Sequence, residues 1–156
     1  MGWGRERTRQ LDTWKTERVQ AEASFSMFRD TIKKLVDRLE GGVGGVLMGF
    51  DGITVESYGR DGVEAVADIQ TIGLEFAHLI AQSRRTAQSL SIGLLRELTF
   101  RTDRLTVLVQ ILNKDYFVAC AFLSPGGRAG EYGAGEKLGR ARYLMRITVP
   151  RIEAEL

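Results

Sequence analysis

The sequence has few of the residues that build disulfides and metal sites. Its 156 residues include one cysteine, Cys120, and one histidine, His78. A lone cysteine cannot form a disulfide within the chain, and because Cys120 lies in an apolar run we expect a buried, unreactive thiol. His78 has no second histidine or cysteine with which to hold a metal, so we expect a structural or surface role for it. We therefore expect no disulfide framework, no metal and no cofactor.

Long apolar runs and a strong charge bias are also missing. No segment approaches the ~20 apolar residues that span a bilayer, and the first residues lack the apolar core of a secretory signal. The 22 lysines and arginines exceed the 20 acidic residues by a net charge of only +2. Such an excess is too small to indicate nucleic acid by electrostatics. We expect a cytoplasmic protein with no membrane span and no nucleic-acid partner.

The residue types that carry enzyme chemistry are scattered along the chain. The glycine-rich run at residues 41–45 lacks the lysine and the following helix of a phosphate-binding loop. Its glycines are better explained by a helix that packs closely on a strand. The carboxylates mostly fall at predicted turns or helix starts, as for Asp51, Asp61, Asp68 and Asp103. We therefore expect that the chain is not itself an enzyme.

The clearest local signal is a β-hairpin at residues 42–58. Asp51-Gly52 stands between two extended runs and predicts a two-residue type I′ turn, in which both residues have positive φ. This turn would place Met48 opposite Val55. The first run is apolar on both faces and the second is more polar, so we expect an inner strand beside an edge strand.

Periodicity predicts the other elements. Apolar residues at helical spacing predict helices at about 19–40, at 63–90 and at 138–156, and Pro150 should kink or break the last of them. Between the second and third helices, three strands are predicted at 94–101, 105–112 and 116–123. The sequence thus predicts an α+β fold, a five-stranded antiparallel sheet with helices on both faces in the order α-β-β-α-β-β-β-α. Residues 1–18 are expected to form a basic arm that precedes the domain at 19–156. The ordinary interpretation is a frayed terminus, and the alternatives are a helix that continues into the next element or a segment that becomes ordered on a partner.

The predicted helix at 63–90 has more apolar surface than one sheet face can cover. One stripe suits a sheet and consists of Val66, Ile69, Gly73, Phe76, Ile80, Ser83 and Ala87. Ile72, Leu74 and Leu79 widen the apolar surface beyond this stripe. A second apolar flank on a helix indicates another helix or another subunit, and no other helix remains on this side of the chain order.

Two stretches carry a resemblance to a known family. In residues 39–57, Gly-Val-Gly-Gly-Val-Leu-Met precedes Phe-Asp-Gly-Ile and an extended run; in residues 138–156, Leu-Gly-Arg-Ala-Arg begins the last helix, with Arg142 in the matching position. With the element order, these stretches resemble the Roadblock domains, the family of the Roadblock-type dynein light chains and of bacterial MglB, and in particular an MglB-like member. The resemblance covers residues 20–156.

The resemblance implies a profilin-like Roadblock fold and a dimer. Roadblock proteins of this kind pair their long central helices and join the edge strands that begin the meander, here residues 63–90 and 94–101. The interface residues implied are Ile72, Leu74, Leu79, Leu94, Arg96 and Leu98. The family's usual role is to bind and regulate small Ras-like GTPases, or to act as an adaptor in a larger assembly.

Three functions stay open on these grounds. A regulator could speed GTP hydrolysis or exchange. If it supplied an arginine to the partner's nucleotide, the candidates expected to be exposed are Arg84 and Arg85 near the end of the long helix and Arg101 and Arg104 beside the meander turn. An adaptor would use the Trp3–Trp14 arm and the dimer surface without affecting nucleotide turnover. A small-molecule sensor of profilin-like or PAS-like architecture would need a cavity between sheet and helix, which the uniformly apolar residues facing that space disfavour.

Overall fold

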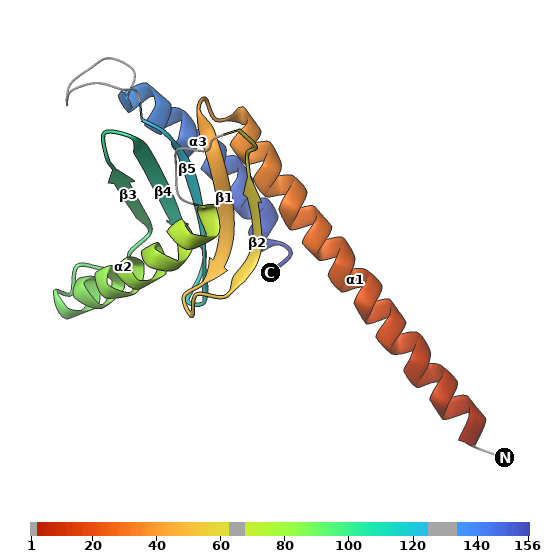
Figure 1. Cartoon of the computed structure of the whole chain (residues 1–156). Coiled ribbons are helices and arrows are strands. Elements are labelled where there is room, and N and C mark those ends of the chain that lie inside the picture. The colour runs from red at the N-terminus through yellow and green to blue at the C-terminus, as the bar shows by residue number, and fades with distance from the viewer. Residues whose placement is uncertain (1–2, 63–67, 125–133) are drawn as a thin grey trace.

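The predicted order of helices and strands is confirmed. A computed structural model describes residues 3–62, 68–124 and 134–156, with side chains from Asp12 onward. The elements are α1 (Trp3–Arg38), β1 (Gly42–Gly49), β2 (Thr54–Gly59), α2 (Ile69–Ser89), β3 (Glu97–Arg101), β4 (Leu105–Ile111), β5 (Tyr116–Leu123) and α3 (Ala134–Glu153). The five strands form one antiparallel sheet in the order β2-β1-β5-β4-β3. Helices α1 and α3 cover one face of the sheet and α2 crosses the other (Figure 1).

The sheet separates two apolar cores. Because side chains alternate along a strand, β5 sends Val118, Cys120 and Phe122 to the face under α1 and α3 and sends the side chains between them to the face under α2. Cys120 is fully buried, and the loss of solvation raises the pKa of its thiol to about 12. This agrees with the expectation of an unreactive thiol.

The glycines of β1 allow helices to lie close on both faces, as the sequence predicted. A Cβ atom at Gly45 would lie 2.7 Å from Cγ2 of Ile32 in α1. On the other face, a Cβ atom at Gly44 would lie 3.0 Å from Cβ of Ile69 in α2. The run is therefore a packing device, in keeping with its lack of a phosphate-loop lysine.

The hairpin between β1 and β2 is present, but its predicted turn type is wrong. Gly52 has a positive φ of 84°, whereas Asp51 does not, and Gly52 N–H donates to the Gly49 carbonyl at 3.0 Å. These features define a three-residue loop at 50–52 that ends in a left-handed glycine, in place of a type I′ turn. Asp51 favours this loop because its Oδ1 accepts a hydrogen bond from Ile53 N–H at 3.0 Å.

The longer loop changes the pairing of the two strands. Met48 lies opposite Thr54, not opposite Val55 as predicted, and the register shifts between Leu47 and Met48. The predicted arrangement of the strands is nonetheless confirmed, because β1 is paired on both sides and β2 lies at an edge of the sheet.

All three helices differ from their predicted bounds, and α3 runs over 134–153 in place of the predicted 138–156. Helix α1 begins at Trp3, so the arm is helical and passes through residue 18 without a break. Helix α2 begins at Ile69, where the Asp68 carboxylate accepts hydrogen bonds from the N–H groups of Gln70 and Thr71 at 3.1 and 3.2 Å. The predicted start at residue 63 falls in 63–67, outside the described residues.

The C-terminal half follows the prediction with smaller differences. Strand β5 has the predicted bounds, β4 ends one residue early, and β3 is shorter than predicted because it begins at Glu97. Helix α3 continues through Pro150 to Glu153, so the helix is not broken there. The glycine-rich run at 124–130, expected from its composition to be a flexible loop, lies mostly in 125–133, outside the described residues.

Candidate interaction surface

The outward side of α2 exposes two large apolar side chains among polar and charged ones. Leu74 and Leu79 are 44% and 38% exposed on this helix. His78 is exposed between them, in agreement with the surface role expected for it. Ile72 points the other way, because it is buried in the core between α2 and the sheet. Leu74 and Leu79, but not Ile72, are therefore available to a partner.

The segment between α2 and β3 adds a second apolar region that sequence reasoning largely missed. Leu90, Ile92 and Leu94 are 62%, 73% and 71% exposed, the last two among the largest such values on apolar side chains of the described chain. Ser91 and Gly93 have positive φ of 53° and 101° and hold this segment in a turn. The alternation of apolar residues with serine and glycine at 90–94 was the available signal. Only Leu94 had been included in the predicted interface.

Strand β3 carries the surface to the sheet edge. It pairs with β4 alone, so its other edge is unpaired among the described strands. Leu98 packs against the core under α2, and Phe100, 44% exposed, contacts Phe76 of α2 edge to face at 5.2 Å between ring centroids. An open strand edge beside exposed apolar groups is a template for pairing with another chain.

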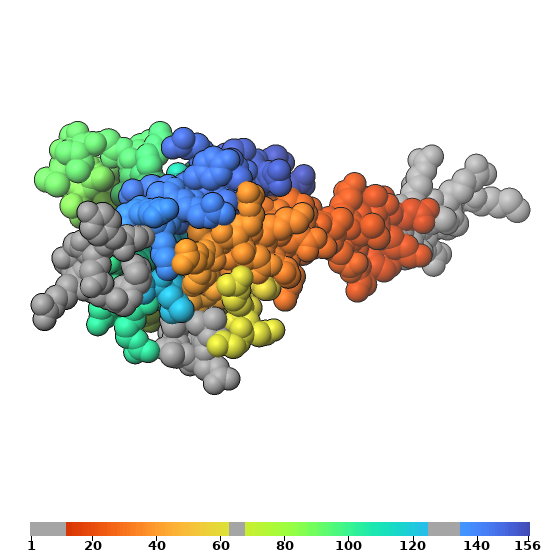
Figure 2. Space-filling view, turned by 90° about the horizontal axis from the view of Figure 1, so that it is seen from above, coloured from red at the N-terminus to blue at the C-terminus, as the bar shows by residue number. Residues whose placement is uncertain are grey.

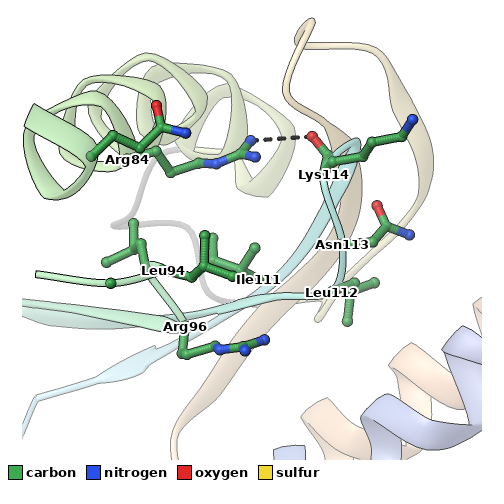
Figure 3. A pocket seen from close by; sticks show the side chains of 10 residues that line it. Arg84, Leu94, Arg96, Ile111, Leu112, Asn113 and Lys114 are labelled. Carbon is green, nitrogen blue, oxygen red and sulfur yellow. Dashed lines mark hydrogen bonds between the residues drawn. The ribbon is translucent and has the colours of Figure 1, made fainter. Parts of the chain in front are cut away.

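A pocket of about 190 Å³ opens beside this surface, where the end of α2 meets the β4–β5 turn (Figure 3). Its walls combine apolar groups with cationic and amide groups: Arg84, Gln88, Gly93, Leu94, Leu95, Arg96, Ile111, Leu112, Asn113 and Lys114. The pocket lies at the margin of α2, whereas a ligand sensor was expected to have its cavity between sheet and helix.

The four predicted partner-binding arginines lie in two groups. Arg84 was expected to be exposed, but its guanidinium lies 4.2 Å from the Phe50 ring centroid and donates to the Lys114 carbonyl at 3.2 Å. Arg85 is exposed on α2 near Arg84. Arg101 and Arg104 are exposed at the other end of β3. The structure therefore does not bring all four together within one chain.

Arg142, singled out in the sequence without a role, links α3 to β3. Its Nη2 and Nε atoms lie 2.7 and 2.8 Å from Oε1 of Glu97. Both side chains are partly exposed, so the pair fixes geometry more than it stabilises the fold. Arg142 thereby connects a helix on one face of the sheet to the edge strand of the candidate surface.

The described residues show no sign of a metal site or a membrane helix. Among them, no group of three or more histidine, cysteine, aspartate and glutamate side chains is placed to hold a metal. No helix within the described ranges is long and apolar enough to cross a membrane.

Solved structures share this fold. MglC from Myxococcus xanthus is 28% identical, with 83% of this chain and 99% of that chain covered and a TM-score of 0.56. A structure described as MglB with tetrameric arrangement is 13% identical, covers 85% of this chain and 90% of its own, and has a TM-score of 0.69. A Roadblock/LC7 domain from Streptomyces avermitilis is 18% identical, with 80% and 92% covered and a TM-score of 0.60.

Comparison by sequence adds no further relative. No protein-family model matches the chain, and no curated protein matches it. The structural likenesses agree with the predicted order of helices and strands. The chain therefore has the fold of the MglC, MglB and Roadblock/LC7 structures to which it is similar.

Proposed function

We propose that this chain is a dimeric cytoplasmic regulator, without catalytic activity of its own, that binds a small Ras-like GTPase and changes its GTP hydrolysis or its nucleotide state. The structural neighbours suggest a regulatory or adaptor role. The observation that carries the proposal is the exposed apolar surface of α2, the 90–94 segment and β3. The GTPase as partner is supported by the resemblance to Roadblock domains.

The dimer is supported by what one chain leaves uncovered. Leu74, Leu79 and Leu94 expose large apolar side chains beside the open edge of β3. Burying such area in a second copy is favourable by roughly 25 cal/mol per Å², and pairing of the edge satisfies its backbone groups. An MglB structure is described as having a tetrameric arrangement, so self-association occurs in a protein of this fold.

Of the four arginines, Arg85 is the better candidate for contact with a GTPase. Arg84 is held against Phe50 and the Lys114 carbonyl, and to reach a nucleotide it would have to give up both contacts. Arg85 is exposed on the same helix. A guanidinium can offset charge that develops on a transferred phosphate, or it can bind the acidic rim of a nucleotide site.

A turnover assay tests the proposal. Release of phosphate from a GTP-loaded small Ras-like GTPase is measured with and without this protein, and a several-fold change is expected. Arg85→Ala should reduce the effect, whereas Lys34→Ala on α1, also an exposed cation, serves as the matched control. Unchanged turnover together with no complex on a sizing column would refute the proposal.

The alternative function, an adaptor without effect on nucleotide turnover, is favoured by the shape of α1. The described part of this helix before Ser24 is exposed and extends away from the body (Figure 2). Trp14 on it is 45% exposed, as suits a segment that contacts another protein. Binding to a GTPase with unaltered turnover, or binding to other proteins only, would favour the adaptor.

A further inference from the structure

The backbone of β3 determines which residues can pair with another strand. The Arg96 carbonyl accepts a hydrogen bond from Ile111 N–H, and Thr102 N–H donates to the Leu105 carbonyl. In an antiparallel pair, alternate residues direct both backbone groups to the same neighbour. The even-numbered residues of β3 therefore bond to β4, and Glu97, Thr99 and Arg101 direct their backbone groups to the free edge.

The side chains of these three residues share one face of the sheet. Leu98 and Phe100 face α2, so by alternation Glu97, Thr99 and Arg101 face the side of α1 and α3. The bond from Arg142 of α3 to Glu97 confirms this orientation. The free edge thus carries a carboxylate at one end, a guanidinium at the other and a threonine between them.

We propose that two copies pair antiparallel along β3 with Thr99 opposite the partner subunit's Thr99. The proposal rests on the dimer of the proposed function and specifies how its strands pair. In this register all five residues of β3, Glu97–Arg101, pair with those of the second copy. Glu97 of each chain then lies directly opposite the partner subunit's Arg101, so two pairs of opposite charge form.

The neighbouring registers that satisfy the same backbone pattern are less favourable. With Leu98 at the centre, Glu97 faces Thr99 and Arg101 faces an apolar leucine, so neither charge is matched. With Phe100 at the centre, Glu97 faces the partner subunit's Asp103, a pair of like charges that destabilises the pairing. Charge complementarity therefore selects the register centred on Thr99.

The second copy would complete a site that one chain begins. Oε1 of Glu97 accepts hydrogen bonds from Nε of Arg142 at 2.8 Å and from Oγ1 of Thr99 at 3.3 Å, and it lies 2.7 Å from Nη2 of Arg142 in an ion pair. Within the described residues, Oε2 of Glu97 accepts no hydrogen bond and Arg101, which is exposed, takes part in no ion pair. The partner subunit's Arg101 then meets a carboxylate that Arg142 has already oriented, which ties α3 to the dimer seam.

Cysteine substitution in the full chain tests the register. Opposed residues of an antiparallel pair are close enough for a disulfide, and native Cys120 is fully buried, so it does not interfere. Under mild oxidation Thr99→Cys should cross-link to a dimer, and Leu98→Cys and Phe100→Cys should not. Cross-linking that is fastest through either of those two would overturn the register and leave the dimer standing. A chain that stays monomeric at all concentrations would refute the dimer itself.

Charge reversal tests the completed site. Arg101→Glu places two carboxylates together at both ends of the seam, and the dimer dissociation constant measured by analytical ultracentrifugation should rise roughly 10- to 30-fold. Arg101→Lys keeps the charge and should change it less than about 3-fold. Lys34→Glu, the same change of sign on an exposed α1 residue, is the control. A dissociation constant that Arg101→Glu leaves unchanged would overturn the pairing of Glu97 with Arg101.

Discussion

The two faces of the sheet are covered to different extents. On one face α1 and α3 lie side by side and bury a core that includes Ile32, Leu144 and Met145. On the other face α2 lies alone, with a core of its own beneath it and exposed Leu74 and Leu79 above it. Both faces have a core of buried apolar side chains. They differ in what the outer surface of their helices exposes.

This difference locates the surface that another chain can use. The 90–94 segment and the free edge of β3 adjoin α2, so apolar side chains and unpaired backbone groups lie next to each other there. The face of α1 and α3 also exposes apolar groups, such as Tyr143 at 55% and Ile147 at 38%. The other edge strand of the sheet, β2, carries the polar residues Glu56 and Ser57, which contact Arg29 of α1 and Gln70 of α2.

The largest loss in the free energy of unfolding is expected when a fully buried isoleucine is truncated. This loss should be similar on the two faces of the sheet. Ile32 of α1 and Ile80 of α2 are both 0% exposed. Ile32→Ala and Ile80→Ala should each lower the free energy of unfolding by about 2–5 kcal/mol, measured by urea denaturation at low chain concentration. A loss below about 1 kcal/mol for Ile80→Ala would show that α2 is not firmly packed, and the comparison of the two cores would fail.

A matched pair of glycines compares how closely the helices approach. A Cβ atom at Gly45 would lie 2.7 Å from Cγ2 of Ile32, a branched side chain with little freedom, whereas one at Gly73 of α2 would lie 3.0 Å from Cε of Met48, which is flexible, and from Cγ1 of Val46. Gly45→Ala should lower the free energy of unfolding by about 1–3 kcal/mol. Gly73→Ala should be closer to neutral, because alanine favours a helix by about 1 kcal/mol.

Equal losses in the two glycine variants would contradict this contrast. They would mean that α2 is held as tightly against the sheet as α1. Thermal denaturation of both variants at one chain concentration is a sufficient check, because a loss of about 1 kcal/mol shifts the midpoint by roughly 2–8 °C.

The sequence predicted the layers of the fold better than its surface. Strand β5 has its predicted bounds because its apolar run has turn residues on both sides. The hairpin turn was wrong because the Asp51 side chain bonds to the backbone two residues on, a local choice that the dipeptide Asp-Gly does not reveal. Residues 91–93 were taken only as the connection between the predicted helix at 63–90 and the predicted strand at 94–101, so the exposure of Ile92 was missed.

The surroundings of the candidate site could not be predicted, because they depend on contacts between residues that are far apart in the sequence. Arg84 was predicted to be exposed from its position near the end of a helix, and its contacts with Phe50 and Lys114 come from segments far from it in sequence. The bond between Arg142 and Glu97 joins residues 45 positions apart. Periodicity gives the face of a helix on which a residue lies, but it does not give the neighbours that the fold brings to that face.

Two residues of equal exposure test the outer surfaces. Leu79 on α2 and Ile147 on α3 are both 38% exposed. Leu79→Glu should raise the dimer dissociation constant roughly 10- to 100-fold, because it places a charge in a buried contact, and Ile147→Glu should leave it unchanged. Sedimentation over a range of concentrations measures both. A larger effect for Ile147→Glu would move the interface to the other face.

The smallest effect on stability is expected on α1, at the part that no face of the sheet supports. Trp14 and Phe28 lie about four helical turns apart on one stripe of this helix, yet Trp14 is 45% exposed and Phe28 only 4%. Trp14→Ala should change the free energy of unfolding by less than about 0.5 kcal/mol, whereas Phe28→Ala should lower it by about 3–5 kcal/mol. Urea denaturation of both variants at two chain concentrations separates the cases. If Trp14→Ala is destabilising only at the higher concentration, a second copy covers the projecting part of α1, and the adaptor surface would have to be sought elsewhere.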